Sequence, residues 1–422
     1  MTDTAVQTAQ HIVVIGAGQS GASVIDALLA NGFGGAITLI GEETYLPYQR
    51  PPLSKKFLSG EMTEDRLAVR PAAFYEKNHI TVRLGTRVEA IDRTHKVVVL
   101  HSGEKIPYDK LALTTGTRVR RIAVPGAELD GVLYSRGIDD IHAIRAHLDC
   151  AQQVAIIGAG FIGLETAAVL HGMGKDVVVL EMQDRVMHRV VAPVVSQFYQ
   201  QLHKSHGIVI RTNVTVAGFE GDASGRITAV RLGDGSRIPA QMAVVGIGVT
   251  PNIELAQAAG LACDNGIIID EYARTSDAAI VAAGDVANHP NGFYRRRIRL
   301  ESVHNAIEQA ETAAMTLLGK TEAYEQYPWF WSDQYDTKLQ MAGLSQGYDN
   351  AVVRGDIASG AFSVFYFLGE KLLAVDSVAK PADHLQARRI LNNQITITPA
   401  QVGDANCDLK ALAVINRHPV RF

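Results

Sequence analysis

Two segments of the chain carry a glycine spacing that can bind a phosphate group. The first is HIVVIGAGQSG at residues 11–21 and the second is VAIIGAGFIG at residues 154–163. In this G-x-G-x-x-G pattern the first glycine allows a tight turn, the second lets backbone amides approach a pyrophosphate, and the third lets a helix pack closely on a strand. The phosphate then lies at the positive N-terminal end of the helix. The glycines are Gly16, Gly18 and Gly21 in the first segment and Gly158, Gly160 and Gly163 in the second.

An acidic residue follows each glycine segment, at the end of the next apolar run. Glu42 stands in AITLIGEE and Glu181 in DVVVLEMQ, where a carboxylate can accept hydrogen bonds from an adenosine ribose. Gly41 separates strand from acid in the first copy, so Glu43 is an alternative to Glu42. Glu181 would repel a 2′-phosphate and therefore favours NADH over NADPH, whereas Arg185 could pair with that phosphate.

The elements that must position these residues are two strand–turn–helix units. Residues 12–15 and 154–157 are apolar runs typical of buried parallel strands, and an Ala- and Leu-rich helical stretch follows each of them. Two complete units in one chain indicate two dinucleotide sites. One site would hold a cofactor that stays bound, and the other a nucleotide that exchanges.

Composition and charge exclude several classes of function. The 422 residues are 47% hydrophobic and 20% charged, as expected for a globular chain of several domains. A formal net charge of −4 provides no global positive field for nucleic acid. The opening MTDTAVQTAQ has no basic residue ahead of an apolar run, so we expect no signal peptide and a cytoplasmic protein. The nearly uncharged stretch 154–170 is shorter than the roughly 20 apolar residues of a bilayer span, so no membrane association is expected.

The cysteines and histidines show no redox or metal motif. Cys150, Cys263 and Cys407 are scattered without a C-x-x-C, which argues against a redox-active dithiol. The histidines form no H-E-x-x-H, and HKSH at 203–206 is interpreted as a solvated helix face. No metal site is predicted.

Further motifs carry a resemblance to a known family. RPPLSK, TTGTR, GDVAN, ESVHNAIEQA and PWFWSDQY follow one another along the chain, together with GAGQSG and GAGFIGLE. In this order they resemble the FAD- and NAD(P)H-dependent pyridine nucleotide-disulfide reductase superfamily, specifically its ferredoxin reductase branch, which lacks the disulfide. The resemblance covers essentially the whole chain.

The resemblance implies roles for individual residues. On the FAD side it places pyrophosphate, ribose, ribityl and flavin contacts at Gly16, Gly18, Ser20, Gly21, Glu42, Arg50, Lys55, Val88, Arg136, Asp285, Val303 and Trp331. On the NADH side it places Gly158, Gly160, Ile162, Gly163, Glu165 and Glu181. Lys55 and Glu165 are the catalytic candidates, because an ion pair near the reactive edge of the flavin could tune hydride acceptance.

The expected fold is α/β, with two Rossmann-like dinucleotide-binding domains arranged as in glutathione reductase and a C-terminal α+β domain. The resemblance makes the FAD domain discontinuous, at 1–115 and 250–326, with the NADH domain at 116–249 and the third domain at 327–422. Helices are predicted over 301–318 and 382–392, and a hairpin with a Gly-Glu turn over 361–378. Two helix faces are expected to be buried, namely Val303, Ala306, Ile307 and Ala310 in one helix and Val194, Phe198 and Leu202 in another.

The expected function is electron transfer from NADH through FAD to a [2Fe-2S] ferredoxin that serves a cytochrome P450 or oxygenase. The alternatives are a reductase of rubredoxin, a quinone or oxygen, and a flavoprotein like apoptosis-inducing factor. Arginines of FYRRRIR at 293–299 are a candidate docking surface, since alternation in a strand would expose Arg295, Arg297 and Arg299. The competing interpretations are an ordinary solvated edge strand and a docking surface around Arg388 and Arg389.

Overall fold

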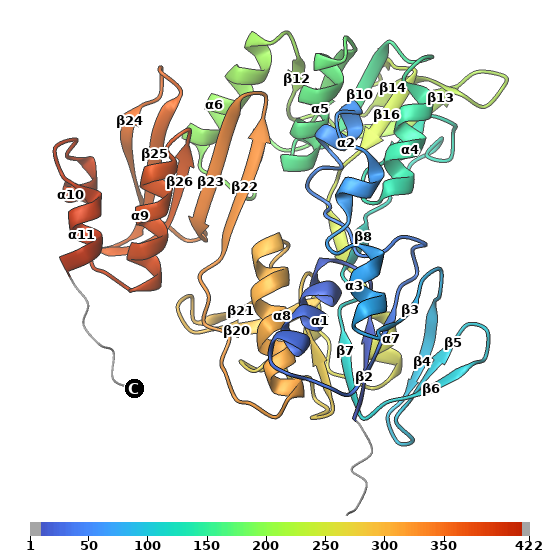
Figure 1. The fold of residues 1–422 in the computed structure, drawn as a ribbon. Coiled ribbons are helices and arrows are strands. Elements are labelled where there is room, and N and C mark those ends of the chain that lie inside the picture. Colours follow the sequence, from blue (N-terminus) through green and yellow to red (C-terminus); the bar gives the residue numbers. More distant parts are fainter. Residues whose placement is uncertain (1–9, 416–422) are drawn as a thin grey trace, which may run out of the picture. The chain divides into compact units, whose positions relative to one another are not determined.

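The computed structural model describes residues 10–415, which form two compact units that each combine distant parts of the sequence (Figure 1). The first unit runs up to Gln49 and includes Glu64–Arg118 and Val249–Gln326. The second unit consists of Arg50–Thr63, Val119–Gly248 and the chain from Tyr327 onward.

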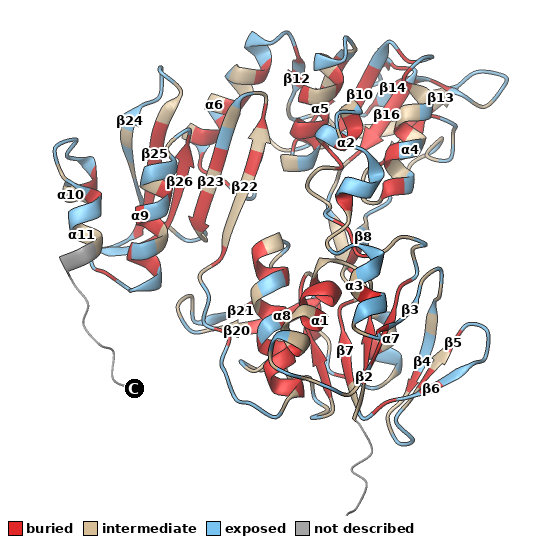
Figure 2. Cartoon of the chain, viewed as in Figure 1, coloured by how far each residue is buried: buried red, intermediate tan, exposed pale blue. Residues whose placement is uncertain are grey.

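A five-stranded parallel sheet forms the centre of the first unit, in the order β19-β7-β1-β2-β3. Ile12, Val13 and Val14 of β1 are fully buried because both faces of the sheet are covered, and the labelled strands β2 and β7 beside it are largely red in Figure 2. Helices α1 and α8 pack against each other beside this sheet. The bounds are β1 (His11–Ile15), β2 (Ala36–Ile40), β3 (Thr81–Arg83), β7 (Lys110–Leu113), β19 (Ile280–Ala282), α1 (Gln19–Ala30) and α8 (Val303–Leu317).

Two smaller sheets complete the first unit. The antiparallel sheet β4-β5-β6 contributes Ile91, Val98 and Ile106 to the same apolar core, and the strands of the sheet β18-β20-β21 lie before and after β19 in the sequence. Their bounds are β4 (Val88–Asp92), β5 (Val97–Leu100), β6 (Lys105–Pro107), β18 (Ile267–Ile268), β20 (Ala287–Asn291) and β21 (Arg296–Ile298). The short helices are α3 (Ala72–Lys77) and α7 (Glu254–Ala258).

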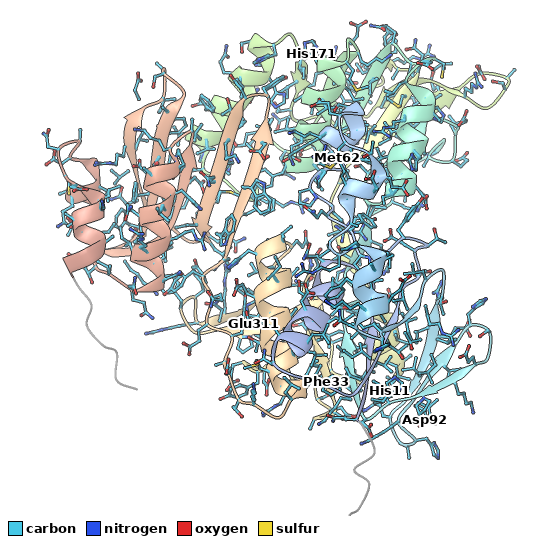
Figure 3. All side chains as sticks on the ribbon, in the orientation of Figure 1. His11, Phe33, Met62, Asp92, His171 and Glu311 are labelled. Atoms are coloured by element: carbon cyan, nitrogen blue, oxygen red, sulfur yellow. The ribbon has the colours of Figure 1, made fainter. Side chains whose placement is uncertain are left out.

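The second unit repeats the first sheet. Its parallel order is β12-β11-β10-β16-β9, so β10 has the place of β1, with β11 and β16 beside it as β2 and β7 are beside β1. Helix α5 follows β10 as α1 follows β1; Figure 3 labels His11 at the start of β1 and His171 in the last turn of α5.

The strands of this second parallel sheet are β9 (Val132–Tyr134), β10 (Gln153–Ile157), β11 (Asp176–Leu180), β12 (Val209–Arg211) and β16 (Met242–Val245). The helices are α2 (Lys56–Ser59), α4 (Ile138–His147), α5 (Phe161–Gly172) and α6 (Pro193–Ser205). An antiparallel sheet of β13 (Val216–Gly221), β14 (Ile227–Leu232) and β15 (Arg237–Pro239) packs on this core, and the pair β8 (Thr117–Val119) and β17 (Val249–Pro251) lies where the chain passes between the units.

The C-terminal part of the second unit is an antiparallel sheet with helices, which confirms the predicted α+β character. The strand order is β22-β23-β26-β25-β24, and β25 and β26 form the expected hairpin around Gly369 and Glu370. The elements are β22 (Trp329–Gln334), β23 (Thr337–Gly343), β24 (Asn350–Asp356), β25 (Ala361–Leu368), β26 (Lys371–Val378), α9 (Pro381–Asn392), α10 (Pro399–Gly403) and α11 (Leu409–Ile415). The predicted helices thus match α8 and α9 to within two residues at each end.

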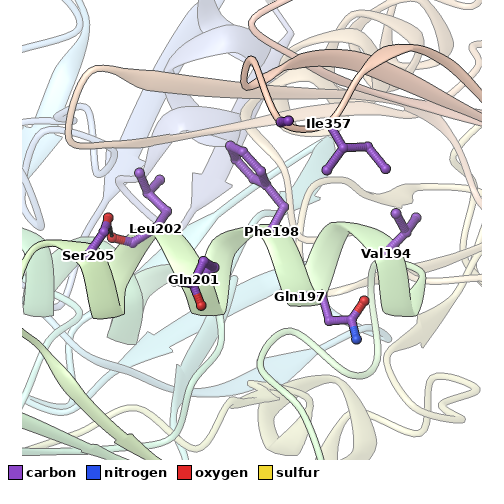
Figure 4. Close-up of a pocket in the computed structure, with 8 residues that line it drawn as sticks. Val194, Gln197, Phe198, Gln201, Leu202, Ser205 and Ile357 are labelled. Atoms are coloured by element: carbon purple, nitrogen blue, oxygen red, sulfur yellow. Dashed lines mark hydrogen bonds between the residues drawn. The ribbon is translucent and has the colours of Figure 1, made fainter.

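The face predicted to be the buried side of α6 is wrong. Val195, Tyr199 and His203 are fully buried, whereas Val194, Phe198 and Leu202 are only partly buried. These last three line a cavity of about 430 Å³ together with Ile357 and Ala358 (Figure 4). The predicted face and the buried face are shifted by one residue along α6, and the turn between β24 and β25 covers the predicted face only in part.

Two other burial predictions are wrong in part. Lys204, Ser205 and His206 of HKSH are exposed as predicted, whereas His203 is fully buried, because α6 packs against the C-terminal sheet there. In α8, Ala306 and Ala310 are buried as expected, but the side chain of Ile307 is 40% exposed.

Candidate functional site

The first glycine loop contains two glycines that the fold itself requires. Gly16 has φ +115°, and a Cβ atom there would lie 2.2 Å from the carbonyl oxygen of Thr114. A Cβ atom on Gly21 would lie 2.1 Å from the carbonyl oxygen of Gly16. Gly18 is different, because it is the N-cap of α1 and has no atom within 4 Å of its Cβ position. The loop therefore leaves open space at the positive end of α1.

Polar groups surround this open space. The hydroxyl of Ser20 is buried and has no hydrogen-bond partner within residues 10–415. Gly284, with φ +83°, brings the end of β19 against Ser20, since a Cβ atom there would lie 2.9 Å from Ser20 Cβ. Thr117 Oγ1 donates to Asp285 Oδ2 at 3.3 Å. A helix N-terminus, an unpaired hydroxyl and a half-buried carboxylate are groups to which the pyrophosphate and ribityl chain of the predicted FAD could bind.

The acidic residue of the first unit stands one position later in the chain, relative to its strand, than Glu181 does in the second unit. Gly41 N donates to Arg83 O just as Glu181 N donates to Arg211 O, so Gly41 has the place of Glu181. A side chain at Gly41 would lie 2.5 Å from Ala17 Cβ, which explains why the acid follows later. Glu42 is 72% exposed, 3.6 Å from an arginine nitrogen of Arg87, and Tyr48 donates to Glu43 at 2.6 Å.

The second glycine loop has the same construction. A Cβ atom on Gly158 or Gly163 would overlap a backbone carbonyl oxygen, whereas Gly160, the N-cap of α5, has open space around it. Glu181 at the end of β11 accepts hydrogen bonds from Ala159 N at 2.7 Å and from Gln183 N at 2.8 Å. The carboxylate is therefore held beside the loop in one orientation. Sequence reasoning did not single out Ala159, although its place between the two glycines was the available signal.

The two catalytic candidates lie in contact in the second unit. Lys55 Nζ is 2.6 Å from Glu165 Oε2, and the Glu165 side chain is only 4% exposed. Ser54 Oγ donates to the same oxygen at 2.7 Å, and Ser332 Oγ donates to Oε1 at 2.7 Å. Burial of a carboxylate is costly unless it is paired and hydrogen-bonded, and here both oxygens are satisfied. Sequence reasoning missed Ser54 and Ser332, although both stand in motifs that it quoted.

Comparisons with known proteins agree with this geometry. Residues 10–310 match the family described as pyridine nucleotide-disulphide oxidoreductase, and residues 329–413 match a reductase C-terminal domain. The chain belongs to the pyridine nucleotide-disulphide oxidoreductase family. It is accordingly an FAD-dependent oxidoreductase with two Rossmann-like regions, and the predicted fold class is confirmed.

Relatives narrow the likeness within the family. Rhodocoxin reductase of Rhodococcus erythropolis is 46% identical over 407 residues, which are 96% of this chain and 95% of the relative. The ferredoxin reductase for the CYP199A2 system of Rhodopseudomonas palustris has a TM-score of 0.94 at 41% identity, covering 96% of this chain and all of that one. The covalent putidaredoxin reductase–putidaredoxin complex gives a TM-score of 0.93 at 42% identity, covering 96% of this chain and 98% of that one. The predicted resemblance to the ferredoxin reductase branch is confirmed.

The remaining candidates on the FAD side lie in different elements of this oxidoreductase. Val88 begins β4 and packs half-buried against the core of the first unit, and Val303 begins α8 after the N-cap Ser302, whose hydroxyl accepts from Asn305 N at 3.1 Å. Arg50 in the second unit donates to the carbonyl oxygen of Arg136 at 2.6 Å. Trp331 of the second unit is half-buried in β22, with its ring centroid 5.4 Å from that of Trp329. On the NADH side, Ile162 is 45% exposed in the first turn of α5.

Arg185 is engaged within its own loop. Its guanidinium donates to Ser196 Oγ at 2.7 Å, to Val191 O at 2.8 Å and to His188 O at 2.9 Å. These bonds direct the cation to the loop between β11 and α6. A 2′-phosphate would have to compete with them, which supports the prediction of NADH over NADPH.

The predicted face of exposed arginines is correct only in part, because Arg295 and Arg297 are exposed but so is Arg296, which was expected on the other face. Strand β21 begins at Arg296, and Arg295 precedes it with φ +50°, so alternation does not extend across the run. Arg297 donates through one nitrogen to the carbonyl oxygens of Ile269 and Asn288. The side chain of Arg299 is 10% exposed and contacts Glu301 at 2.8 Å and the carbonyl oxygen of Asp285 at 2.9 Å. Arg297 and Arg299 therefore also hold the local structure, although Arg297 is exposed like Arg295, and of the three predicted arginines Arg299 is the one that is largely buried.

Residues 10–415 contain neither a metal-binding cluster nor a membrane-spanning helix. No group of three His, Cys, Asp or Glu side chains in that part of the chain is arranged to hold a metal ion. Within the same residues, no helix combines the length and the apolar character needed to cross a bilayer.

Proposed function

We propose that this oxidoreductase passes electrons from NADH, through FAD, to a [2Fe-2S] ferredoxin that serves a cytochrome P450 or another oxygenase. The observation that carries the proposal is the pair of complete dinucleotide loops, each with open space at its second glycine. One loop accounts for a resident cofactor and the other for an exchanging nucleotide.

The proposal assigns FAD to the first unit. Gly16, Gly18, Ser20 and Gly21 would hold its pyrophosphate, Asp285 its ribityl chain and Glu42 its ribose. The supporting observations are the buried, unpaired hydroxyl of Ser20 among the described residues and the half-buried carboxylate of Asp285. The domain division proposed with this assignment keeps 1–115 and 250–326 for FAD, 116–249 for NADH and 327–422 for the third domain.

The proposal assigns NADH to the second unit. Gly158, Gly160, Ile162, Gly163 and Glu181 would bind it, and the carboxylate of Glu181, held by Ala159 N and Gln183 N, would receive the ribose hydroxyls. This carboxylate also disfavours a 2′-phosphate.

The ion pair of Lys55 and Glu165 is proposed to adjust the charge around the hydride-accepting edge of the flavin, with Arg50, Val88, Arg136, Val303 and Trp331 as further contacts. Bound FAD takes up two electrons together and releases them singly, which suits an iron–sulfur acceptor. The cysteines Cys150, Cys263 and Cys407 are free and separate, so the electrons would leave to an external acceptor and not to a dithiol of the chain. A cytoplasmic location belongs to the proposal, because thiols stay reduced and NADH is supplied there.

A flavin analysis tests the first half of the proposal. Protein purified without added cofactor should be yellow and should release about one FAD per chain when denatured, as expected for one complete first unit. Finding FMN, or no flavin after reconstitution with FAD, would contradict it.

A steady-state assay tests the second half. NADH oxidation is followed with cytochrome c as reporter, with and without a bacterial [2Fe-2S] ferredoxin. The ferredoxin should raise the rate of cytochrome c reduction at least about tenfold, because without ferredoxin no protein that docks on the reductase is present. A rubredoxin, a quinone or oxygen accepting electrons faster than the ferredoxin would select the alternative reductases. Slow turnover with every acceptor would select a flavoprotein like apoptosis-inducing factor.

A further inference from the structure

The motif PWFWSDQY contains two polar residues that the proposed function does not use. Ser332 and Gln334 stand two positions apart in β22 and therefore point to the same face of the sheet. Both side chains are completely buried. Buried polar side chains require hydrogen-bond partners, and the partners of Ser332 and Gln334 connect them to Glu165 and His203.

A chain of hydrogen bonds runs from these residues to the carboxylate of Glu165. Ser332 Oγ donates to Glu165 Oε1 at 2.7 Å, and Gln334 Nε2 donates to Ser332 Oγ at 3.1 Å. His203 Nε2 is 2.8 Å from Gln334 Oε1, and Tyr335 OH is 3.2 Å from His203 Nδ1. The chain thus joins α5, β22 and α6, all within the second unit.

Every donor in this chain points toward Glu165. The carbonyl oxygen of Gln334 can only accept, so His203 must donate from Nε2, which leaves Nδ1 to accept from Tyr335. Burial raises the pKa of Tyr335 to about 12, so its hydroxyl keeps the proton that it donates. Burial lowers the pKa of His203 to about 4, so the imidazole is neutral near pH 7. Aligned donors of this kind polarise one another and strengthen the bond to the final acceptor.

The chain completes the shell around one carboxylate. Lys55 and Ser54 hold Oε2 of Glu165, and Ser332 holds Oε1. One serine would have been enough to satisfy Oε1. The additional groups restrain that serine, because the amide of Gln334 occupies an acceptor site on its hydroxyl and leaves its hydrogen for Glu165.

We propose that Ser332 and Gln334 are positioning residues for Glu165, holding its carboxylate in the orientation that contacts Lys55 through a hydrogen-bonded chain anchored at His203 and Tyr335. The inference rests on the proposed function, in which Lys55 and Glu165 act beside the flavin. It assigns to the C-terminal domain a part in setting the rate of hydride transfer.

The first test is the tautomer of His203, which needs no turnover. In protein labelled with ¹⁵N-histidine and assigned with a His203→Gln variant, His203 should be a neutral Nε2–H tautomer from pH 6 to pH 8. Gln334→Leu should shift the His203 nitrogen signals, because the acceptor of Nε2–H is lost. A Nδ1–H tautomer, a charged ring at pH 7, or an unchanged spectrum in Gln334→Leu would overturn the proposal.

The second test is flavin reduction by NADH, followed by stopped-flow absorbance in the FAD-loaded protein. Ser332→Ala and Gln334→Leu should each lower the limiting rate constant about tenfold and change the Kd for NADH less than about twofold, because they misplace Glu165 without touching the nucleotide loop. Ser363→Ala is the matched control. Ser363 is an equally buried serine of the same sheet, bonded to Ser377 and Asp383, and its removal should leave the rate unchanged.

A double-mutant cycle decides whether Ser332 acts through Glu165. In a Glu165→Gln background, Ser332→Ala should change the reduction rate constant less than about twofold, since the carboxylate to be positioned is gone. A tenfold loss in both backgrounds, or no loss in either single variant, would overturn the proposal. If the FAD-loaded protein does not react with NADH at all, the proposed function fails, and the hydrogen-bonded chain still stands or falls by the tautomer of His203.

Discussion

At the scale of single residues, the glycines of each loop divide into two kinds. Gly16 and Gly21 are demanded by the backbone, because any Cβ atom there would overlap a carbonyl oxygen. Gly18 makes no such demand, and its lack of a side chain fits the pyrophosphate proposed at the N-terminus of α1. The same division holds in the second loop, which supports a nucleotide at each.

The first prediction separates these two kinds of glycine. Gly18→Ala should fold normally and lose most of its bound FAD, since the added methyl group occupies the space proposed for the pyrophosphate. The readout is flavin per chain after gel filtration, with thermal unfolding followed by circular dichroism. Gly34→Ala is the matched control, because Gly34 also has open space around it but lies outside the loop. Full FAD occupancy in Gly18→Ala would contradict the assignment of this loop.

The second prediction concerns the choice of nucleotide. Glu181→Ala combined with Met182→Arg should shift the ratio of kcat/KM for NADH and NADPH by about 100-fold toward NADPH, because a repulsive carboxylate is removed and a cation is added. Met182 is 60% exposed, so the new arginine can reach solvent and a phosphate. Measurement of both kinetic constants for both nucleotides checks it. A wild-type protein that already prefers NADPH would refute the role given to Glu181.

At the scale of elements, the C-terminal sheet contains a buried carboxylate that the electron-transfer site does not use. Asp376 in β26 is 3% exposed, and Tyr366 of the neighbouring strand donates to it at 2.6 Å. Burial raises the pKa of Asp376 from 3.8 to about 7, and the hydrogen bond from Tyr366 opposes that rise. The folded protein therefore binds a proton more tightly than the unfolded chain does.

The third prediction follows from that difference. The free energy of unfolding should fall as pH rises from 4 to 7, by up to about 1.4 kcal/mol per pH unit from this group, and then level off. Asp376→Asn should remove this contribution and should be more stable than wild type at pH 8. Urea unfolding can be followed by tryptophan fluorescence, because Trp329 and Trp331 are the chain's two tryptophans and both belong to β22 of this sheet. Asp336→Asn, at an exposed position, is the control, and parallel pH profiles for wild type and Asp376→Asn would exclude the effect.

At the scale of the whole molecule, the proposed docking of a ferredoxin, a class of protein that is typically acidic, meets a chain whose net charge is −4. Long-range attraction then depends on local cations, and it is screened over about 8 Å at physiological ionic strength. The structure leaves Arg295 exposed beside β21, while Arg299 of the same segment is bonded to the backbone of Asp285. The segment is therefore tied to the proposed FAD site of its own unit.

The fourth prediction tests Arg295 as a docking cation. Arg295→Gln should raise the KM for ferredoxin about two- to fourfold and flatten its dependence on salt, because steering is weakened. Ferricyanide reduction should be unchanged, since that small acceptor needs no docking surface. Arg237→Gln, an equal loss of charge at an exposed site of the second unit, is the control. An unchanged salt dependence would show that Arg295 is not part of the docking surface, and Arg388 and Arg389 would be the next candidates.

Local sequence patterns determined the parts of this protein that depend on backbone sterics. The glycine spacing, the apolar runs before it and the turn before Asp285 each follow from residues close together in the chain, so both nucleotide units could be predicted. The helices α8 and α9 were predicted for the same reason, because helical periodicity is a local property.

Tertiary structure alone decided which side chains meet. Ser332 and Glu165 are 167 positions apart, and no periodicity indicates that a serine of β22 caps a carboxylate of α5. The buried face of α6 was mispredicted, and the carbonyl partners of Arg297 were not foreseen, for a related reason. A sequence pattern shows which residues share a face of an element. Only the neighbouring element in the folded protein shows whether that face is covered and which carbonyl groups need a hydrogen-bond donor.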